Sequence, residues 1–264
     1  MTPLKMFFYL LSFAQCWGYN SNVLETALAL SSAAYCPKDD YNMINIAGLF
    51  EYDSTLYDRR SDLLGFVGRV PSQKTIYVAL RGTSSPMNWF RDFEFTHVAY
   101  ETFPECNCSV HKGFYLSARG VRDDAIDSVR RLRSWYPADV VVVVGHSYGA
   151  STAQLVAMEL VKAGIPTRVY NFGQPRVGDS AYSFFMTHHV ELVRVTHNRD
   201  IVPHVPPTSL NYQHSAGEIF EDESGNLHEC VGGEDTKCSQ QYSLSQGSVD
   251  DHMVYLGQPV ECRL

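Results

Sequence analysis

Long apolar runs and dense clusters of basic residues are both missing from this chain of 264 residues. Beyond the N-terminal stretch, no segment reaches the roughly 20 apolar residues that a membrane-spanning helix needs. The 21 lysines and arginines are outnumbered by 29 aspartates and glutamates, so a nucleic-acid partner is not expected. Internal repeats, low-complexity segments and long linkers are also absent. With 45% hydrophobic residues, the chain is predicted to form one globular domain.

The first 18 residues, MTPLKMFFYLLSFAQCWG, have the pattern of a secretory signal peptide. A lone lysine precedes a short apolar run, Met6 to Ala14, and small residues follow it. That run is too short to cross a bilayer, and the alternative interpretation is a buried first helix. We expect residues 1–18 to be removed, which leaves a secreted, extracellular domain at 19–264.

Six of the seven cysteines lie after residue 18, so all six can pair in an oxidising compartment. The histidines form no tight ligand pattern around these cysteines, and no metal site is predicted. Asn107 begins the formal glycosylation sequon Asn107-Cys108-Ser109.

Hydrophobic periodicity predicts strands that alternate with helices. Helices are predicted at 21–35, 111–135, 150–162 and 179–188, and strands at 43–52, 63–70, 75–80, 140–144, 168–172 and 192–196. This alternation favours an α/β fold with a sheet that is largely parallel in its second half. The last third is rich in turn residues, so loops and short strands stapled by disulfides are expected there.

The stretch DVVVVVGHSYGAS, residues 139–151, has the pattern of a nucleophile elbow. An unbroken valine run fits a strand that is buried on both faces. Gly145, Ser147 and Gly149 then form a G-x-S-x-G motif just before the predicted helix. The bare motif is common by chance, but a strand before it and a helix after it are the context that a nucleophile elbow requires. Ser147 is therefore the candidate nucleophile.

A serine hydroxyl needs a base to take its proton, and the base needs an orienting acid. His252 lies in a turn-rich segment near the chain end, SVDDHMVYLG, and is the candidate base. Asp200 lies just beyond a predicted strand, at the sheet edge where chemistry gathers in α/β folds. The order Ser147, Asp200, His252 is the one expected of an α/β-hydrolase.

The residues alone leave His204 as an alternative base and Asp250 as an alternative acid. His146 adjoins the candidate nucleophile, but neighbours on a sharp turn project in different directions. It is expected to be a packing residue.

Four motifs together resemble the fungal-type class 3 lipases and the related feruloyl esterases. They are GHSYGAS, LRGTSSPMNW, THNRDIVPHVPP and DHMVYLG, and they occur in the family's order. The resemblance extends from AAYC at 33–36 to Cys262. It implies a single-domain α/β-hydrolase fold with a mostly parallel central sheet and a short helical lid.

Carried over position by position, the resemblance implies that Ser147 is the nucleophile, Asp200 the acid and His252 the base. It argues against His204 and Asp250 in these roles.

The same comparison implies an oxyanion hole formed by Thr83 and Tyr148. Thr83 would contribute its backbone N–H and hydroxyl, and Tyr148 its backbone N–H. The alternative for Thr83 is a simple strand-end turn. Tyr148 replaces the leucine that is common after the family's nucleophile, which keeps the backbone donor but changes the shape of the acyl pocket.

Residues 84–95, SSPMNWFRDFEF, resemble the lid of the lipases. Trp89, Phe90 and Phe93 are expected on one side of a short helix, where they would cover the site in water and turn toward lipid. Exposing such a face to water costs roughly 25 cal/mol per Å². The alternative is that these aromatics are ordinary core residues. The Asn88-Trp89 pair resembles lipases more than feruloyl esterases.

By resemblance, Cys36 pairs with Cys262, and Cys230 pairs with Cys238. Cys106 and Cys108 are separated by one residue, and so small a ring strains disulfide geometry. A third bridge, two free thiols and pairing with other chains all stay open for them.

These observations predict a secreted serine esterase, most simply a triacylglycerol lipase that acts as a monomer on a lipid ester at an oil–water interface. No cofactor or metal is implied. Feruloyl esters, phospholipids and galactolipids are the alternative substrates for the same triad. The alternative outside enzymes is an inert lipid-binding relative that has lost turnover.

Overall fold

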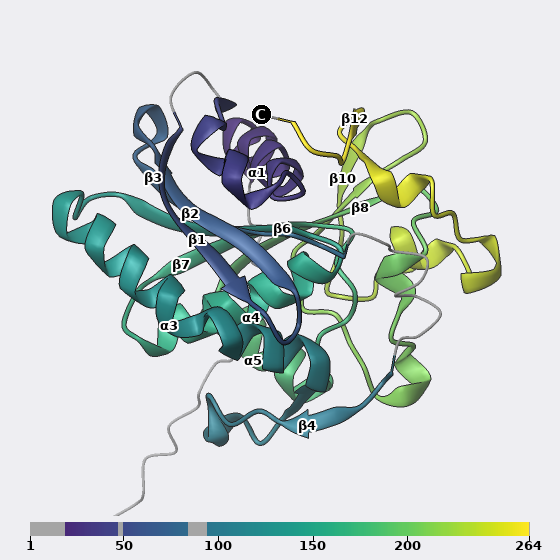
Figure 1. Cartoon of the computed structure of the whole chain (residues 1–264). Coiled ribbons are helices and arrows are strands. Elements are labelled where there is room, and N and C mark those ends of the chain that lie inside the picture. The colour runs from purple at the N-terminus through teal and green to yellow at the C-terminus, as the bar shows by residue number, and fades with distance from the viewer. Residues whose placement is uncertain (1–18, 47–49, 84–93, 264) are drawn as a thin grey trace, which may run out of the picture.

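In the computed structural model the described residues are 19–46, 50–83 and 94–263. The predicted signal peptide, 1–18, and the predicted lid residues Trp89, Phe90 and Phe93 lie outside them. Helices cover both faces of a central sheet, with α1 on one face and α3, α4 and α5 on the other (Figure 1).

The central sheet has the strand order β1-β2-β3-β6-β7-β8-β9-β10. Its strands are β1 (Glu51–Asp58), β2 (Leu63–Val70), β3 (Thr75–Leu80), β6 (Val140–His146), β7 (Thr167–Phe172), β8 (Glu191–His197), β9 (Glu218–Glu221) and β10 (Leu227–Glu229). Pairing is parallel from β3 through β6, β7 and β8 to β9, and antiparallel at the two ends. The predicted α/β fold, parallel in its second half, is confirmed.

The helices are α1 (Ser21–Ala33), α3 (Lys112–Trp135), α4 (Tyr148–Lys162) and α5 (Ser180–His189). Two small hairpins pair β4 (His97–Ala99) with β5 (Ser109–His111), and β11 (Val254–Tyr255) with β12 (Gln258–Pro259). Single 3-10 turns occur at Lys38–Met43, Pro71–Gln73, Pro104–Cys106, Val202–His204, Thr208–Leu210, Ser239–Gln241, Leu244–Gln246 and Asp251–Met253.

The valine run forms the middle of the sheet and joins two hydrophobic cores. Val141 and Val143 pack into the core under α3 and α4, while Val142 and Val144 pack into the core under α1. A strand buried on both faces needs apolar residues at consecutive positions rather than at alternate ones. The valine run therefore places the end of β6, and the serine that follows it, at the centre of the molecule.

The strand predicted at 43–52 is displaced: of its described residues only 51 and 52 belong to a strand, and 47–49 lie outside the described part of the chain. Lys38–Met43 is a 3-10 turn, and the first strand, β1, occupies Glu51–Asp58. Along β1 only Leu56 is buried, because β1 is an edge strand of the sheet. An edge strand exposes one of its sides and accepts the charged and polar residues of EYDSTLYD, which gave no apolar signal.

Three disulfides link the six described cysteines. Cys36 and Cys262, with Cα atoms 4.5 Å apart, join the residues after α1 to the end of the chain. Cys230 pairs with Cys238. Cys106 and Cys108, left open by the sequence, are also paired, with Asn107 exposed between them. Glycosylation of Asn107 stays a prediction.

Candidate active site

Ser147 lies on a sharp turn between β6 and α4, with φ 59° and ψ −129°. A non-glycine residue at positive φ is strained, and such strain clusters at functional sites. The flanking glycines permit the turn because backbone atoms approach them too closely for a side chain to fit. A Cβ on Gly145 would lie 2.5 Å from the Gly149 carbonyl oxygen, and one on Gly149 would lie 2.3 Å from the Leu80 carbonyl oxygen. Any larger side chain would push β6, α4 and the end of β3 apart.

His252 and Asp200 lie side by side in the interior. The Nδ1 of His252 is 2.8 Å from Oδ2 of Asp200, and both side chains are buried. The hydroxyl of Tyr255 donates to the same oxygen, and the backbone N–H of Val202 donates to Oδ1 over 2.8 Å. Because a carboxylate only accepts, Nδ1 of His252 carries the proton and Nε2 of the neutral ring is left to accept one.

Burial raises the pKa of Asp200, but the positive charge that His252 carries when protonated and the hydrogen bond from His252 outweigh it, together with the hydrogen bonds from Tyr255 and Val202. The net pKa lies below its usual value. Asp200 therefore stays ionised beside the imidazole.

The end of β7 contacts both Ser147 and His252. The backbone N–H of Ser147 donates to the Phe172 carbonyl over 2.9 Å. The next residue, Gly173, faces the histidine, because a Cβ there would lie 2.7 Å from Cε1 of His252. Within the described residues, Oγ of Ser147 and Nε2 of His252 are buried and make no hydrogen bond. Both are the atoms that proton transfer from serine to histidine would use.

Thr83 and Tyr148 line one cavity of about 280 Å³ near the same turn. Thr83 follows the end of β3, and Tyr148 is the first residue of α4. In any α-helix the first backbone N–H groups have no partner inside the helix. The Tyr148 hydroxyl lies 2.6 Å from Oγ of Ser117 and donates to the Gly113 carbonyl over 3.2 Å.

A model of the family described as lipase (class 3) matches residues 77–210, about half of the chain. The chain belongs to the class 3 lipase family. Its architecture is the α/β-hydrolase fold of the fungal lipases, as the resemblance implied.

Two curated class 3 lipases show the extent of the match. The lipase of Rhizomucor miehei is 33% identical over 214 residues, which are 78% of this chain and 57% of the relative. The secreted mono- and diacylglycerol lipase A of Penicillium camembertii is 33% identical over 192 residues, which are 72% of this chain and 60% of the relative. The chain thus spans between about half and three fifths of the length of the curated relatives it matches.

Solved structures are matched more completely. The Rhizomucor miehei triacylglyceride lipase has a TM-score of 0.84 at 31% identity, covering 92% of this chain and 96% of that one. The lipase of Rhizopus microsporus var. chinensis has a TM-score of 0.85 at 29% identity, covering 92% and 89%. A further match, with a TM-score of 0.83, 31% identity and coverage of 92% and 96%, is a triacylglycerol lipase whose catalytic centre is formed by a serine protease triad.

The two alternative residues lie elsewhere in this class 3 lipase. Asp250 is exposed, and it is Asp200 that meets the imidazole of His252. His204 is buried in the 3-10 turn Val202–His204, where its carbonyl accepts from the Arg176 guanidinium over 2.6 Å.

Sequence reasoning missed three residues that touch this site. Tyr255 donates a hydrogen bond to the Asp200 carboxylate. His146 is hydrogen-bonded to the Tyr35 hydroxyl and to the backbone carbonyl of His252. Tyr35 and Tyr255 stand in the stretches AAYC and DHMVYLG of the family resemblance, which was the available signal. The expectation that His146 only packs was incomplete, because both of its ring nitrogens are hydrogen-bonded.

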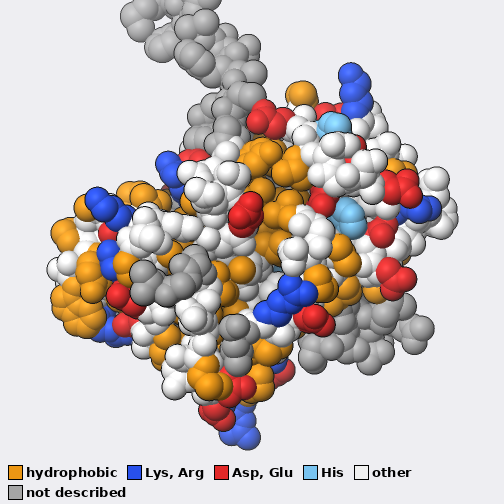
Figure 2. All heavy atoms as spheres, turned by 90° about the horizontal axis from the view of Figure 1, so that it is seen from above, with side chains coloured by type: hydrophobic (Ala, Val, Ile, Leu, Met, Phe, Trp, Pro, Cys, Tyr) orange, Lys and Arg blue, Asp and Glu red, His pale blue; other side chains and the backbone are white. Residues whose placement is uncertain are grey.

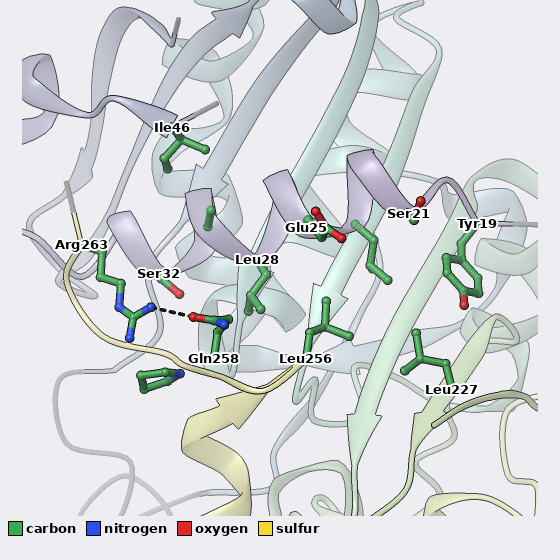
Figure 3. Close-up of a pocket in the computed structure, with 13 residues that line it drawn as sticks. Tyr19, Ser21, Glu25, Leu28, Ser32, Ile46, Leu227, Leu256, Gln258 and Arg263 are labelled. Atoms are coloured by element: carbon green, nitrogen blue, oxygen red, sulfur yellow. Dashed lines mark hydrogen bonds between the residues drawn. The ribbon is translucent and has the colours of Figure 1, made fainter. Parts of the chain in front are cut away.

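A second cavity, of about 510 Å³, lies beside α1 and is separate from this site (Figure 3). Leu28 of α1 faces Leu256 and Leu227 across it, Leu24 also lines it, and Arg263 stands at one end. Figure 2 looks down on this side of the class 3 lipase, where hydrophobic side chains gather between acidic and basic ones. None of Ser147, Asp200 and His252 lines this cavity.

Across the described ranges, no three His, Cys, Asp or Glu side chains are grouped as a metal site would need. Over the same part of the chain, no helix is long and apolar enough to cross a membrane.

Proposed function

We propose that this class 3 lipase is a secreted serine esterase that hydrolyses carboxylic esters of lipids, with triacylglycerols as its main substrates. The observation that carries the proposal is the buried His252–Asp200 pair next to a serine on a strained strand-to-helix turn. Relatives named as triacylglycerol lipases support the substrate class.

In the proposed reaction, Oγ of Ser147 attacks the ester carbonyl while Nε2 of His252 takes the hydroxyl proton. The carbonyl electron pair moves to oxygen, and the resulting oxyanion accepts hydrogen bonds from Thr83 and from the backbone N–H of Tyr148. When the C–O bond of the ester breaks, His252 returns the proton to the leaving alcohol. Water then enters, gives a proton to His252 and splits the acyl-enzyme, which frees the fatty acid and restores Ser147.

Asp200 acts through charge and orientation in this scheme. It accepts a hydrogen bond from the Nδ1–H of His252, which fixes the tautomer, and it stabilises the imidazolium that forms during each step. Its lowered pKa supports this role, because a protonated acid could not offset the positive charge of the ring.

The remaining expectations belong to the same proposal. Trp89, Phe90 and Phe93 would form the lid that opens at an oil surface, where exposing their side chains costs little. Residues 1–18 would direct secretion, and the three disulfides support an oxidising environment. The mature domain would act as a monomer, with a lipid ester at the interface as its partner.

Hydrolysis of tributyrin by the purified protein tests the proposal, measured by pH-stat across the solubility limit of the substrate. A sharp rise in rate when droplets appear is expected from a lidded lipase. Ser147→Ala should abolish hydrolysis, whereas Ser151→Ala should keep it. Ser151 lies one turn further along the same helix, buried, with its hydroxyl bonded to the Pro175 carbonyl at 3.0 Å. Full activity in Ser147→Ala would refute the proposed mechanism.

One observation favours esters of smaller, more polar acids as a second candidate. The cavity that Thr83 and Tyr148 line also contains Asp62 and Arg81, which form an ion pair at 2.7 Å. An ion pair next to the proposed oxyanion site suits a substituted aromatic acid better than a long acyl chain. A rate that saturates smoothly below the solubility limit, together with hydrolysis of methyl ferulate, would favour this feruloyl-type function.

Two further outcomes of the substrate tests are informative. Faster turnover of phospholipids or galactolipids than of tributyrin would change the proposed substrate class but not the proposed triad. Labelling of Ser147 by an organophosphonate would exclude an inert lipid-binding protein.

A further inference from the structure

His146 connects two residues that are far apart in the sequence. Its Nε2 lies 2.8 Å from the backbone carbonyl oxygen of His252, and its Nδ1 lies 2.7 Å from the hydroxyl oxygen of Tyr35. The His146 ring is fully buried, and it lies against the ring of His252 with the centroids 4.4 Å apart.

The chemistry of the partners fixes the direction of these hydrogen bonds. A backbone carbonyl only accepts, so Nε2 of His146 carries a proton and donates a hydrogen bond to the His252 carbonyl. Burial lowers the pKa of His146 to about 3, and the neighbouring His252 lowers it as well, so the ring is neutral. Nδ1 is therefore bare, and the Tyr35 hydroxyl donates to it.

The hydroxyl of Tyr35 also reaches the loop of the proposed oxyanion hole. The Tyr35 hydroxyl oxygen lies against Gly82, the residue before Thr83. The fit is close, because a Cβ on Gly82 would lie 2.1 Å from that oxygen. Hydrogen bonds thus run from the Tyr35 hydroxyl through His146 to the backbone of His252, and the same hydroxyl packs against Gly82.

The backbone of His252 needs an anchor of this kind because it lies in a short turn. It lies in a three-residue 3-10 turn, Asp251–Met253, outside the strands of the sheet. Its backbone N–H donates to the Val249 carbonyl over 3.1 Å, which is a bond within the same loop. The bond from His146 to its carbonyl ties that loop to the end of β6, directly before Ser147.

We propose that His146 is a positioning residue that holds the backbone of His252 at a fixed distance from Ser147, and that Tyr35 sets the tautomer His146 needs for this. The catalytic meaning of this device rests on the proposed function, since it presumes that His252 accepts the proton of Ser147. The Tyr35 hydroxyl would also help to place the oxyanion loop relative to the histidine, because it packs against Gly82.

The test compares Tyr35→Phe with Tyr41→Phe. Tyr41 is a nearby buried tyrosine whose hydroxyl donates to the Ala34 carbonyl over 2.8 Å and has no bond to the site. Each change removes one hydroxyl and its hydrogen bonds. We expect Tyr35→Phe to lower kcat for a soluble ester about 10-fold or more with KM nearly unchanged. Tyr41→Phe should keep kcat within about twofold.

A second readout does not depend on turnover. In protein labelled with ¹⁵N at histidine, the ring resonances of His252 should shift in Tyr35→Phe and stay in place in Tyr41→Phe. Equal kcat and equal His252 resonances in the two variants would overturn the proposal. If Tyr35 had only a structural role, Tyr35→Phe would lower the melting temperature, but its kcat would stay equal to that of Tyr41→Phe.

If Tyr35→Phe fails to fold, His146→Gln and His146→Leu carry the test. Glutamine can still donate an N–H to the His252 carbonyl and leucine cannot, so only His146→Gln should recover a substantial part of kcat. Equal losses in the two would overturn the proposal. Failure of the proposed function gives a different pattern: the unaltered protein would hydrolyse no ester, while the His252 resonances would still report on positioning.

Discussion

The Nδ1 of His252 lies 2.8 Å from a carboxylate oxygen of Asp200, although 52 positions separate the two residues in the chain. Their loops are joined by backbone pairing at Ser248, whose N–H donates to the Arg199 carbonyl over 2.7 Å and whose carbonyl accepts from Ile201. Main-chain bonds therefore align the pair before any substrate arrives. Such preorganisation is what a proton-transfer site requires.

Asp200→Asn tests the role of this pair. The amide keeps the shape of the side chain but removes the charge and permits the wrong tautomer of His252. We expect kcat to fall by about 10³–10⁴ with KM nearly unchanged. The control is Asp250→Asn, an exposed acid two positions from His252. Ester hydrolysis by both variants measures the difference, and a larger loss in Asp250→Asn would reverse the assignment of the acid.

Gly173→Ala tests the contact between β7 and His252. Gly173 has φ +56°, and an added Cβ would lie 2.7 Å from Cε1 of the histidine. Gly164 has φ +79°, and a Cβ added there would meet no atom within 4 Å, so Gly164→Ala brings only the backbone strain of about 1–2 kcal/mol. We expect kcat to fall at least 10-fold in Gly173→Ala alone. Indistinguishable kcat values in the two variants would contradict this contact.

Stability should fall as the pH drops below about 6.5, the unperturbed pKa of histidine. Burial lowers the pKa of His111 to about 4, of His146 to about 3, and of His214 well below its usual value. The unfolded chain therefore binds protons that the folded one excludes, and each of these histidines removes about 2 kcal/mol between pH 6.5 and pH 5.

Urea unfolding at pH 8, 6.5 and 5 measures this loss. The free energy of unfolding should be nearly constant above pH 7 and decline steeply below pH 6.5. His214→Gln should make the decline shallower, since the amide does not titrate. A midpoint that stays constant down to pH 5 would show that these histidines are not held neutral.

The Cys36–Cys262 disulfide should contribute more stability than Cys230–Cys238. The first closes a loop with a sequence separation of 226 residues and the second one of 8. In the chain-entropy account, cross-linking distant residues restricts the unfolded chain more. Replacing both Cys36 and Cys262 by serine should cost about 2–5 kcal/mol in the free energy of unfolding, and the equivalent change at Cys230 and Cys238 clearly less. Calorimetric melting compares them.

The buried elements of the fold were predictable because their patterns are local. Leu63–Val70 and Thr75–Leu80 form strands as predicted, and the valine run forms β6. The first strand was placed too early because its position at the sheet edge exposes polar residues. Exposure at an edge depends on strand order, which no local window contains.

The candidate site was also predictable only where its signal is local. The motif around Ser147 and the order of Asp200 and His252 could be read from the sequence, with the family resemblance deciding between rival residues. The contacts of His146 with Tyr35 and with the backbone of His252 could not, because they join the turn after α1, the strand β6 and a C-terminal turn through the interior. Hydrogen bonds to a backbone carbonyl leave no residue-type signal at the accepting position.

The two edges of the eight-stranded sheet bear on how copies of this protein behave when crowded. A flat, unpaired edge is a template on which a strand from another molecule can add. Here β1 is interrupted by an irregularity between Tyr52 and Ser54 and carries Asp53, which is paired with Arg131. At the other edge, β10 has only three residues. Neither edge offers a long, regular row of free amides, so association through added strands is disfavoured even at high local concentration.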